Sequence, residues 1–295
     1  MHRYLRAIGF SVLKNRNQVN ELLGYVVRNS QEQSYTSIDD AGDFLFAEYL
    51  MEFMPGVGLG VRGEYSDDNQ FMLGYYFPYC KGAQISSYEY VDIERHAEKE
   101  SYAGSCDDLK LGVTLIFYLQ NVIPYLKRAH AGRLPEKGTS LTLGGLSVEG
   151  RILLPLAKKE SEKRRVQKEA VSRSRRLTAA RNGDEEALES LTLEDIDTYS
   201  NISRLILKQD VLTLVDTYFM PHGIECDQYS ILGEIVSYEQ FENKLSGEKV
   251  WVMTLICNDL YFDIAINAQD LIGEPRAGRR FKGIIWMQGH VNYPD

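Results

Sequence analysis

GVGLGVRGEYSDDNQFMLGYYFPYC, residues 56–80, is the stretch that decides the fold class. Two runs rich in aliphatic and aromatic residues flank the Asp-Asp-Asn triplet at 67–69, which is typical of turns. The pattern predicts two antiparallel strands joined by a tight turn. Apolar residues at helical spacing between Asn17 and Asn29 predict an amphipathic helix before them. We therefore expect an α+β protein whose N-terminal part contains an antiparallel sheet.

The remainder of residues 1–157 continues in a β-rich texture. SSYEYVDIERH (86–96) alternates apolar and polar residues, and KLGVTLIFYLQN (110–121) is apolar on both faces, so both predict strands. NVIPYLKRAH (121–130) predicts a short helix with a proline in its first turn. Glycines at 144, 145 and 150 predict a hairpin within residues 140–156.

Residues 158–209 form a charged helical connector. Lys158 to Arg181 carries ten basic and three acidic residues, whereas Asp184 to Asp197 carries seven acidic residues and no basic one. Asn182-Gly183 between them is a helix-ending signal. The two net charges, +7 and −7, cancel, so the basic helix pairs as readily with an acidic segment as with RNA.

Residues 210–295 predict a small β-barrel-like, OB-like domain. Five runs rich in β-branched and aromatic residues are separated by glycine, proline, asparagine and aspartate. Residues 210–219 fit a helix as well as a strand. The expected organisation is an α+β domain at 1–157, the connector at 158–209, and the barrel-like domain at 210–295.

Charge and composition exclude several protein classes. The net charge of −9 over 295 residues disfavours wholesale nucleic-acid binding. The four cysteines have no paired spacing and predict reduced, mostly buried thiols. No signal-peptide pattern opens the chain, and the longest apolar stretch, residues 111–126, is too polar for a membrane span. We expect a cytoplasmic protein.

Several long strings resemble one protein family. They are RLTAARNGDEEALESLTLEDIDTYSNISRLILKQD (176–210), PHGIECDQYSILGEI (221–235), LIGEPRAGRRFKGIIWMQGH (271–290), YLRAIGF (4–10) and GVTLIFYLQN (112–121). The chain resembles a family of uncharacterised bacterial proteins, a domain of unknown function about as long as this chain. The resemblance implies no activity, and no functional residue follows from it.

Two motifs suggest chemistry but fail on context. GLGVRG, residues 58–63, matches the GxGxxG spacing of dinucleotide-binding loops, yet turn and strand residues follow where such a loop needs a helix. In GSCDD, residues 104–108, the negative charges of Asp107 and Asp108 raise the pKa of the Cys106 thiol and weaken it as a nucleophile. We expect strand and turn roles for both motifs, and no cofactor.

Four residues remain as catalytic candidates. Asp92, Glu94 and His96 alternate, so they project from one face of a strand and could bind a metal or exchange protons. The same alternation describes the solvent face of any antiparallel sheet. His222 lies near Cys226, but a zinc site needs about four ligands, and the other cysteines have no matching spacing. We predict no metal site.

The C-terminal part contains a candidate anion-binding cluster. Arg276, Arg279, Arg280 and Lys282 lie within residues 273–283, with Glu274 in the same stretch as an internal partner. The aromatic residues nearby could stack on nucleic-acid bases. Six basic and nine acidic residues between 231 and 295 leave no basic groove, which favours core packing for these rings.

The preferred interpretation is a non-enzymatic module that binds a ligand or a protein partner, associates with itself, or acts as a scaffold. One alternative is nucleic-acid binding through the basic helix and the C-terminal barrel. The other is an enzyme with a site at the domain junction, and no membrane association is expected.

Overall fold

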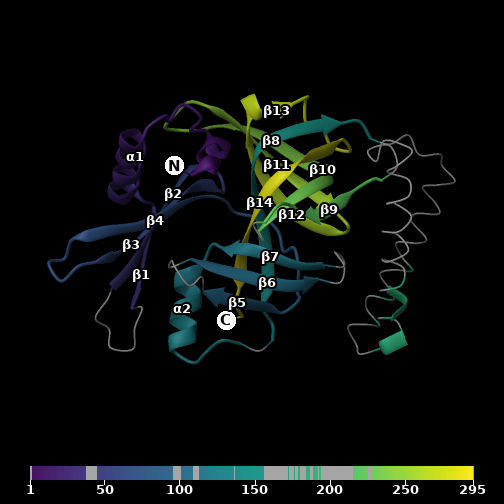
Figure 1. Cartoon of the computed structure of the whole chain (residues 1–295), viewed down its shortest axis with the longest axis horizontal. Coiled ribbons are helices and arrows are strands. Elements are labelled where there is room, and N and C mark those ends of the chain that lie inside the picture. The colour runs from purple at the N-terminus through teal and green to yellow at the C-terminus, as the bar shows by residue number, and fades with distance from the viewer. Residues whose placement is uncertain are drawn as a thin grey trace.

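The computed structural model describes most of the chain. The described ranges are 2–37, 45–95, 101–108, 113–135, 137–155, 215–224 and 227–294, with scattered residues between 172 and 193. Figure 1 shows a mainly β protein in which a small sheet carrying a helix lies beside a larger, barrel-like sheet. The expected α+β class, with an antiparallel sheet and a small barrel, is confirmed.

Sheet A, the smaller sheet, contains four antiparallel strands in the described part of the chain. In spatial order these are β1 (Glu32–Ser37), β2 (Leu45–Met54), β3 (Val57–Tyr65) and β4 (Phe71–Cys80). The predicted hairpin is β3 and β4, and Asn69 in its turn has a φ of 58°. The predicted helix is α1 (Arg16–Asn29), which buries Val19, Leu22, Leu23 and Val26 in the same core as the sheet.

The glycines of GLGVRG let aromatic rings cross β3. A Cβ atom on Gly60 would lie 2.4 Å from a ring carbon of Phe77, and one on Gly58 would lie 2.6 Å from the Tyr79 hydroxyl. The two aromatic residues come from β4, directly opposite these glycines. The motif is therefore part of a strand that needs glycine for close packing, as expected from its context.

Sheet B contains ten strands in the described part of the chain, and five of them close into a barrel. The barrel order is β8 (Ser140–Leu153), β12 (Leu260–Asn267), β11 (Lys249–Cys257), β10 (Gln228–Glu242) and β14 (Arg280–Asn292), which pairs back to β8. β8 and β12 run parallel, and the other barrel pairs are antiparallel. The short strands β9 (Tyr218–Pro221) and β13 (Leu271–Ile272) pair with β10 and β8.

The hairpin predicted within residues 140–156 is wrong, because β8 is one continuous strand. Its glycines are points of close approach: a Cβ atom on Gly144 would lie 1.9 Å from the carbonyl oxygen of Cys80. A Cβ atom on Gly150 would lie 2.4 Å from the ring of Phe281. The strand that closes the barrel comes from residues 140–153, outside the 210–295 segment expected to form the barrel.

Three further strands extend sheet B beyond the barrel. They are β7 (Val113–Leu119), which runs parallel to β14, then β6 (Tyr102–Asp108) and β5 (Val91–Arg95). The predicted short helix follows β7 as α2 (Val122–His130), with Pro124 in its first turn. Within the described ranges, two short 3-10 helices, η1 (Arg3–Ile8) and η3 (Ala268–Asp270), complete the fold.

Arg280 joins two segments that are distant in sequence, the end of β8 and the residues just before β9. Its Nε and Nη2 atoms donate to the carbonyl oxygen of Leu154 at 3.1 and 3.0 Å, and Nη1 donates to that of Val215 at 2.9 Å. The predicted connector at 158–209 lies largely outside the described residues. Within it, Arg176 and Ser190 are helical, and Nη1 of the arginine donates to Oγ of the serine at 3.2 Å.

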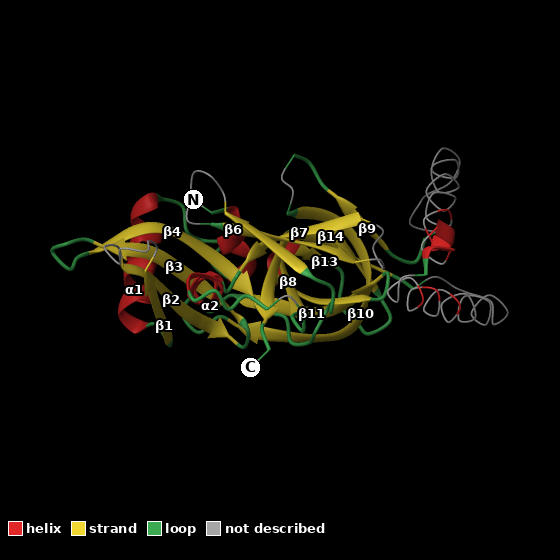
Figure 2. Ribbon diagram, turned by 90° about the horizontal axis from the view of Figure 1, so that it is seen from below, coloured by secondary structure: helices red, strands yellow, loops and turns green. Residues whose placement is uncertain are grey.

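Two hydrophobic cores hold the described chain together. One fills the barrel and reaches α2, and the other lies between sheet A, α1, η1 and the adjoining side of the barrel. Tyr118 and Trp286 belong to the second core, so strands of sheet B help to bury sheet A. Figure 2 shows sheet A, α1 and the barrel from below. Among the helices that the structure describes, none is long and apolar enough to cross a bilayer.

Candidate binding groove at the edge of sheet A

A buried arginine joins sheet A to β7. The side chain of Arg62, on β3, is fully buried and forms an ion pair with Glu48 of β2. Its Nη1 donates to the hydroxyls of Tyr75 at 2.7 Å and Tyr118 at 3.1 Å, and its Nη2 donates to the carbonyl oxygen of Gln120 at 2.5 Å. Each guanidinium nitrogen is therefore already committed to a protein acceptor.

The electrostatics of this pair favour a charged arginine. Burial opposes the charge, but the Glu48 carboxylate together with Tyr118 and Tyr75 outweighs burial and raises the pKa of Arg62 above its usual range. The guanidinium carbon also lies 4.3 Å from the centre of the Phe77 ring, at cation–π distance. Burial in turn raises the pKa of Glu48, and Arg62 counteracts this effect. The ion pair between Arg62 and Glu48 is therefore part of the protein interior.

Two buried glutamine side chains close the inner half of the β4 edge, which we define as Phe77–Cys80. The Cys80 N–H donates to Oε1 of Gln288 at 3.1 Å, and Nε2 of Gln288 donates to the Pro78 carbonyl at 2.8 Å. Nε2 of Gln120 donates to the Cys80 carbonyl at 2.9 Å. Side-chain amides therefore take the place of a neighbouring strand here.

A groove of about 1060 Å³ runs along the outer half of the β4 edge, which we define as Phe71–Tyr76. Six consecutive residues, Met72–Phe77, line it. Neighbouring side chains of a strand point to opposite faces, so a hollow lined by consecutive residues follows the edge of the strand. Phe46 of β2 and Gly63 and Glu64 of β3 also line it, so the hollow extends from this edge over part of sheet A. The facing wall comes from one face of α1 and from sheet B: Arg16, Val19, Asn20, Leu23, Tyr118 and Trp286.

The main chain of the outer half faces this groove. Among the described residues, β4 pairs with β3 on one side and with no strand on the other. Alternate residues of an antiparallel strand direct their N–H and C=O groups outward. Pro78 and Cys80 have this outward orientation, since the glutamines reach them from outside. Tyr76 has the same parity, so its main-chain groups point into the groove.

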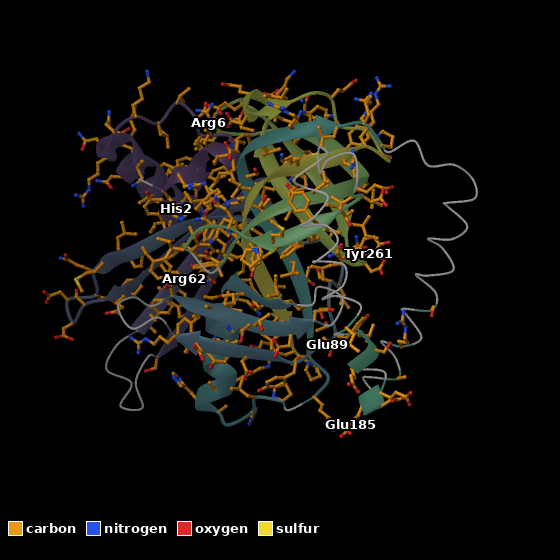
Figure 3. All side chains as sticks on the ribbon, turned by 45° about the vertical axis from the view of Figure 1, so that its right-hand side comes forward. His2, Arg6, Arg62, Glu89, Glu185 and Tyr261 are labelled. Carbon is orange, nitrogen blue, oxygen red and sulfur yellow. The ribbon has the colours of Figure 1, made fainter. Side chains whose placement is uncertain are left out.

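Aromatic rings form a fixed wall of the groove. The Trp286 ring lies 5.1 Å from that of Tyr118, 4.9 Å from that of His2 and 5.3 Å from that of Tyr4, measured between ring centres. From behind, its Nε1 donates to Oδ2 of Asp227 at 2.7 Å. Figure 3 shows His2 and Arg62 on this side of the molecule, where the strands of sheet A reach the barrel.

The rim of the groove carries more positive than negative charge. Lys14 and Arg16 lie at the start of α1, and Glu64 is the acidic residue among the described lining residues. The first turn of α1 contains no acidic side chain, so the partial positive charge of the helix N-terminus is not offset there. This contrasts with the whole chain, whose net charge is −9.

A second hollow, of about 110 Å³, lies against the inner half and includes Glu48, Tyr79, Lys81 and His290 in its lining. Lys81 is held by ion pairs to Glu32 at 3.3 Å and Glu52 at 3.1 Å. Burial, and then the charge of Lys81, lower the pKa of His290. The hollow is too small for a drug-sized ligand, whose pockets are about 300–1,000 Å³.

The structure separates His222 from Asp92 and Glu94, the other described catalytic candidates from the sequence. Asp92 and Glu94 are exposed on β5, and His96 lies outside the described residues. His222 is exposed beyond β9, which pairs with β10; three strands, β14, β7 and β6, separate β10 from β5. Among the described residues, no group of three histidine, cysteine or acidic side chains could hold a metal.

Three of the four basic residues proposed as an anion site, Arg276, Arg279 and Arg280, donate to acceptors within the protein. Arg276 pairs with the Glu274 carboxylate at 2.8 Å, and Nη1 of Arg279 donates to the Glu274 carbonyl at 2.7 Å. Arg280 is buried and donates to the carbonyl oxygens of Leu154 and Val215. Lys282 is half-buried on β14. The internal partner Glu274 is confirmed, while an anion site stays a prediction.

The cysteines are free and buried where the structure describes them. Cys80, Cys106 and Cys257 form no disulfide, as expected, and Cys226 lies outside the described residues. Burial raises the pKa of Cys106 to about 12, with a smaller contribution from Asp108. The sequence suggested a weak nucleophile for reasons of neighbouring charge, but burial is the larger cause.

Sequence reasoning missed the residues that define this region. Arg62 is a charged residue within a glycine-rich, otherwise apolar strand, and that contrast is a signal of a buried ion pair. Its partner Glu48 and the two glutamines carry no such local signal. Their partners lie at sequence separations of 14 to 210 residues, which no local pattern reveals.

Comparisons with known proteins give one family. A family model described as "Domain of unknown function, E. rectale Gene description (DUF3881)" matches residues 5–289. This confirms the resemblance to a family of uncharacterised bacterial proteins. No curated protein and no solved structure matches the chain.

Proposed function

We propose that this chain, which belongs to the family of unknown function whose model it matches, is a non-enzymatic binding protein. Its ligand is a segment of a partner protein, held in the groove along the outer half of β4. The observation that carries the proposal is a β4 edge that pairs with no described strand and lies beside a fixed aromatic wall. Exposed edges of this kind are natural sites for strand-like ligands.

The commitments of the polar groups around the groove argue for binding and against catalysis. Among the lining residues, the hydroxyls of Tyr75 and Tyr118 accept from Arg62, and the indole nitrogen of Trp286 donates to Asp227. A catalytic base must reach the substrate proton in a plausible pose. The exposed Asp92 and Glu94 lie on β5, on the far side of β6 from the groove-lining Tyr118 of β7.

We place the protein in the cytoplasm. The free and buried state of Cys80, Cys106 and Cys257 supports this location, because reducing compartments keep thiols unpaired.

Selection from a phage library of random linear peptides tests the proposal. Wild-type protein should enrich peptides that bind in solution and change the fluorescence of Trp286, one of the two tryptophans of the chain. Met72→Lys should remove the binding, because Met72 lines the groove with 55% of its surface exposed. Such an exposed substitution should alter stability by no more than about 0.5 kcal/mol.

Met220→Lys is the matched control for this experiment. Met220 is 46% exposed on β9 and does not line the groove. Peptides that bind wild type and Met220→Lys but not Met72→Lys would support the proposal. A selection that enriches no peptide, or peptides that bind Met72→Lys equally well, would overturn it.

A further inference from the structure

We infer that the groove takes an extended, acidic segment of the partner, which adds to the outer edge of β4 as a fifth strand of sheet A. This inference rests on the proposed function and specifies how the groove binds. It makes two separable claims, main-chain pairing with β4 and recognition of negative charge by the start of α1.

Main-chain pairing follows from the state of the β4 edge. On the inner half, Pro78 has no N–H and the glutamines occupy the remaining outward groups of Pro78 and Cys80. On the outer half, no described strand pairs with the outward groups of Tyr76. Proteins usually blunt an exposed edge with charges, proline, bulges or a covering element. The outer half contains a bulge at Gly74 but no charge or proline, and it exposes Met72 and Leu73, at 55% and 47%.

The lining of the groove suits an apolar strand. Part of the lining is aliphatic and comes from Val19 and Leu23 of α1. Another part is aromatic, with the ring centres of Tyr118 and Trp286 5.1 Å apart. Apolar side chains of the ligand would pack against both parts.

Charge complementarity identifies the ligand as acidic. The exposed Lys14 and Arg16 lie at the start of α1, and the Asn15 side chain caps this helix by accepting from the Gln18 N–H at 2.9 Å. No acidic side chain of the first turn neutralises this end. Carboxylates are favoured at a helix N-terminus, and more so beside basic side chains. An acidic segment therefore gains attraction at the rim while its apolar residues enter the groove.

Backbone N-methylation of the selected peptides tests main-chain pairing. Only alternate N–H groups of an added strand point toward β4. Methylating one position at a time should therefore weaken binding about tenfold or more at every second position and leave the intervening positions close to wild type. Uniform tolerance of methylation along the peptide would overturn the pairing claim.

Charge recognition has its own matched pair of variants. Lys14→Gln/Arg16→Gln should weaken binding of the same peptides about tenfold at low salt, and the difference should shrink as salt is added. The control is Arg28→Gln, at the other end of α1, where Arg28 is exposed and does not line the groove. Equal effects of the two substitutions, or enrichment of peptides without acidic residues, would overturn the charge claim.

The outcomes separate this inference from the proposed function. Peptide binding that depends on Met72, but shows no alternating effect of N-methylation and no dependence on Lys14 and Arg16, would support the proposed function and contradict the inference. The other occupant to consider is the β4 edge of a second copy of the chain. Sedimentation analysis showing a dimer that Met72→Lys dissociates would assign the edge to self-pairing and overturn the acidic ligand.

Discussion

The inner and outer halves of β4 belong to one strand but meet different neighbours. The inner half ends in Pro78, Tyr79 and Cys80, and the amides of Gln120 and Gln288 occupy its outward main-chain groups. The outer half runs beside a groove, with Tyr76 directed into it. A strand edge sealed over only part of its length is what we expect where a partner covers the rest. The predictions below test how far this difference holds.

The largest effect should come from the arginine beneath both halves. Arg62→Met leaves the Glu48 carboxyl in a buried position without its cation. Removing one partner of a buried pair costs about 3–5 kcal/mol. We expect the free energy of unfolding, measured by urea denaturation with circular dichroism, to fall by about this amount.

The double variant Glu48→Leu/Arg62→Met is the control, because it removes both charges together. Replacing a whole buried pair by apolar residues is often neutral or stabilising. The double variant should therefore be more stable than Arg62→Met alone. An Arg62→Met protein as stable as wild type would show that Arg62 and its ion pair do not stabilise this region of the fold.

Gln288→Met should leave main-chain groups of the inner half of β4 without hydrogen-bond partners. It removes the acceptor of the Cys80 N–H and the donor to the Pro78 carbonyl. Each buried group left without a partner costs about 1–3 kcal/mol. Hydrogen exchange gives the sharper measurement: the Cys80 amide should be protected in wild type and lose protection in the variant.

The Tyr76 amide supplies the internal reference for this exchange experiment. No described strand pairs with it, so it should exchange rapidly in wild type and in Gln288→Met alike. Strong protection of Tyr76 in the free protein would mean that the outer half is already closed, and the proposed difference between the halves would disappear.

Gly60→Ala should disturb the packing of a β4 ring on β3. Its Cβ atom would lie 2.4 Å from a Phe77 ring carbon, so the ring must move. Overpacking of this kind costs about 1–3 kcal/mol of unfolding free energy. The control is Gly74→Ala in the outer half, where the nearest heavy atom to the new Cβ would be the Arg62 carbonyl oxygen at 3.4 Å. Similar melting temperatures for the two variants would contradict this account.

Local patterns predict most of the elements because the forces involved act over a few residues. The apolar periodicity of α1, the turn before β4 and the alternation in β5 all survive in the structure. β8 is the exception, since Gly144 and Gly150 look like turn residues. They are glycines because Cys80 and Phe281 approach them closely, and these neighbours are far away in sequence.

The candidate site is harder to predict because it is assembled from long-range contacts. Arg280 is a residue whose sequence context and structural contacts point to different roles. In the sequence it belongs to a basic cluster that suggests an anion, yet in the fold it donates to the Leu154 and Val215 carbonyls. Residue type indicates which chemistry a side chain can perform, and only the fold decides which partner uses it.

The smallest effect should be a pH dependence beside the inner half. His290 has a lowered pKa because of burial and the nearby charge of Lys81, against a weaker opposing effect of Glu32. The folded state therefore binds fewer protons than the unfolded state once pH falls below about 6.5, the usual value for histidine. The contribution of His290 to stability is fully present above that pH. It should be lost as pH falls through the lowered, folded-state pKa.

Denaturation of wild type and His290→Asn between about pH 7 and 5 measures this contribution. The stability advantage of wild type over the variant should shrink as pH falls, whereas the exposed His222→Asn control should follow the wild-type curve. Parallel curves for wild type and His290→Asn would contradict the prediction. His290 does not line the outer groove, so peptide affinity should not change as His290 titrates. Stability near the inner half would then depend on pH, whereas binding at the outer half would not.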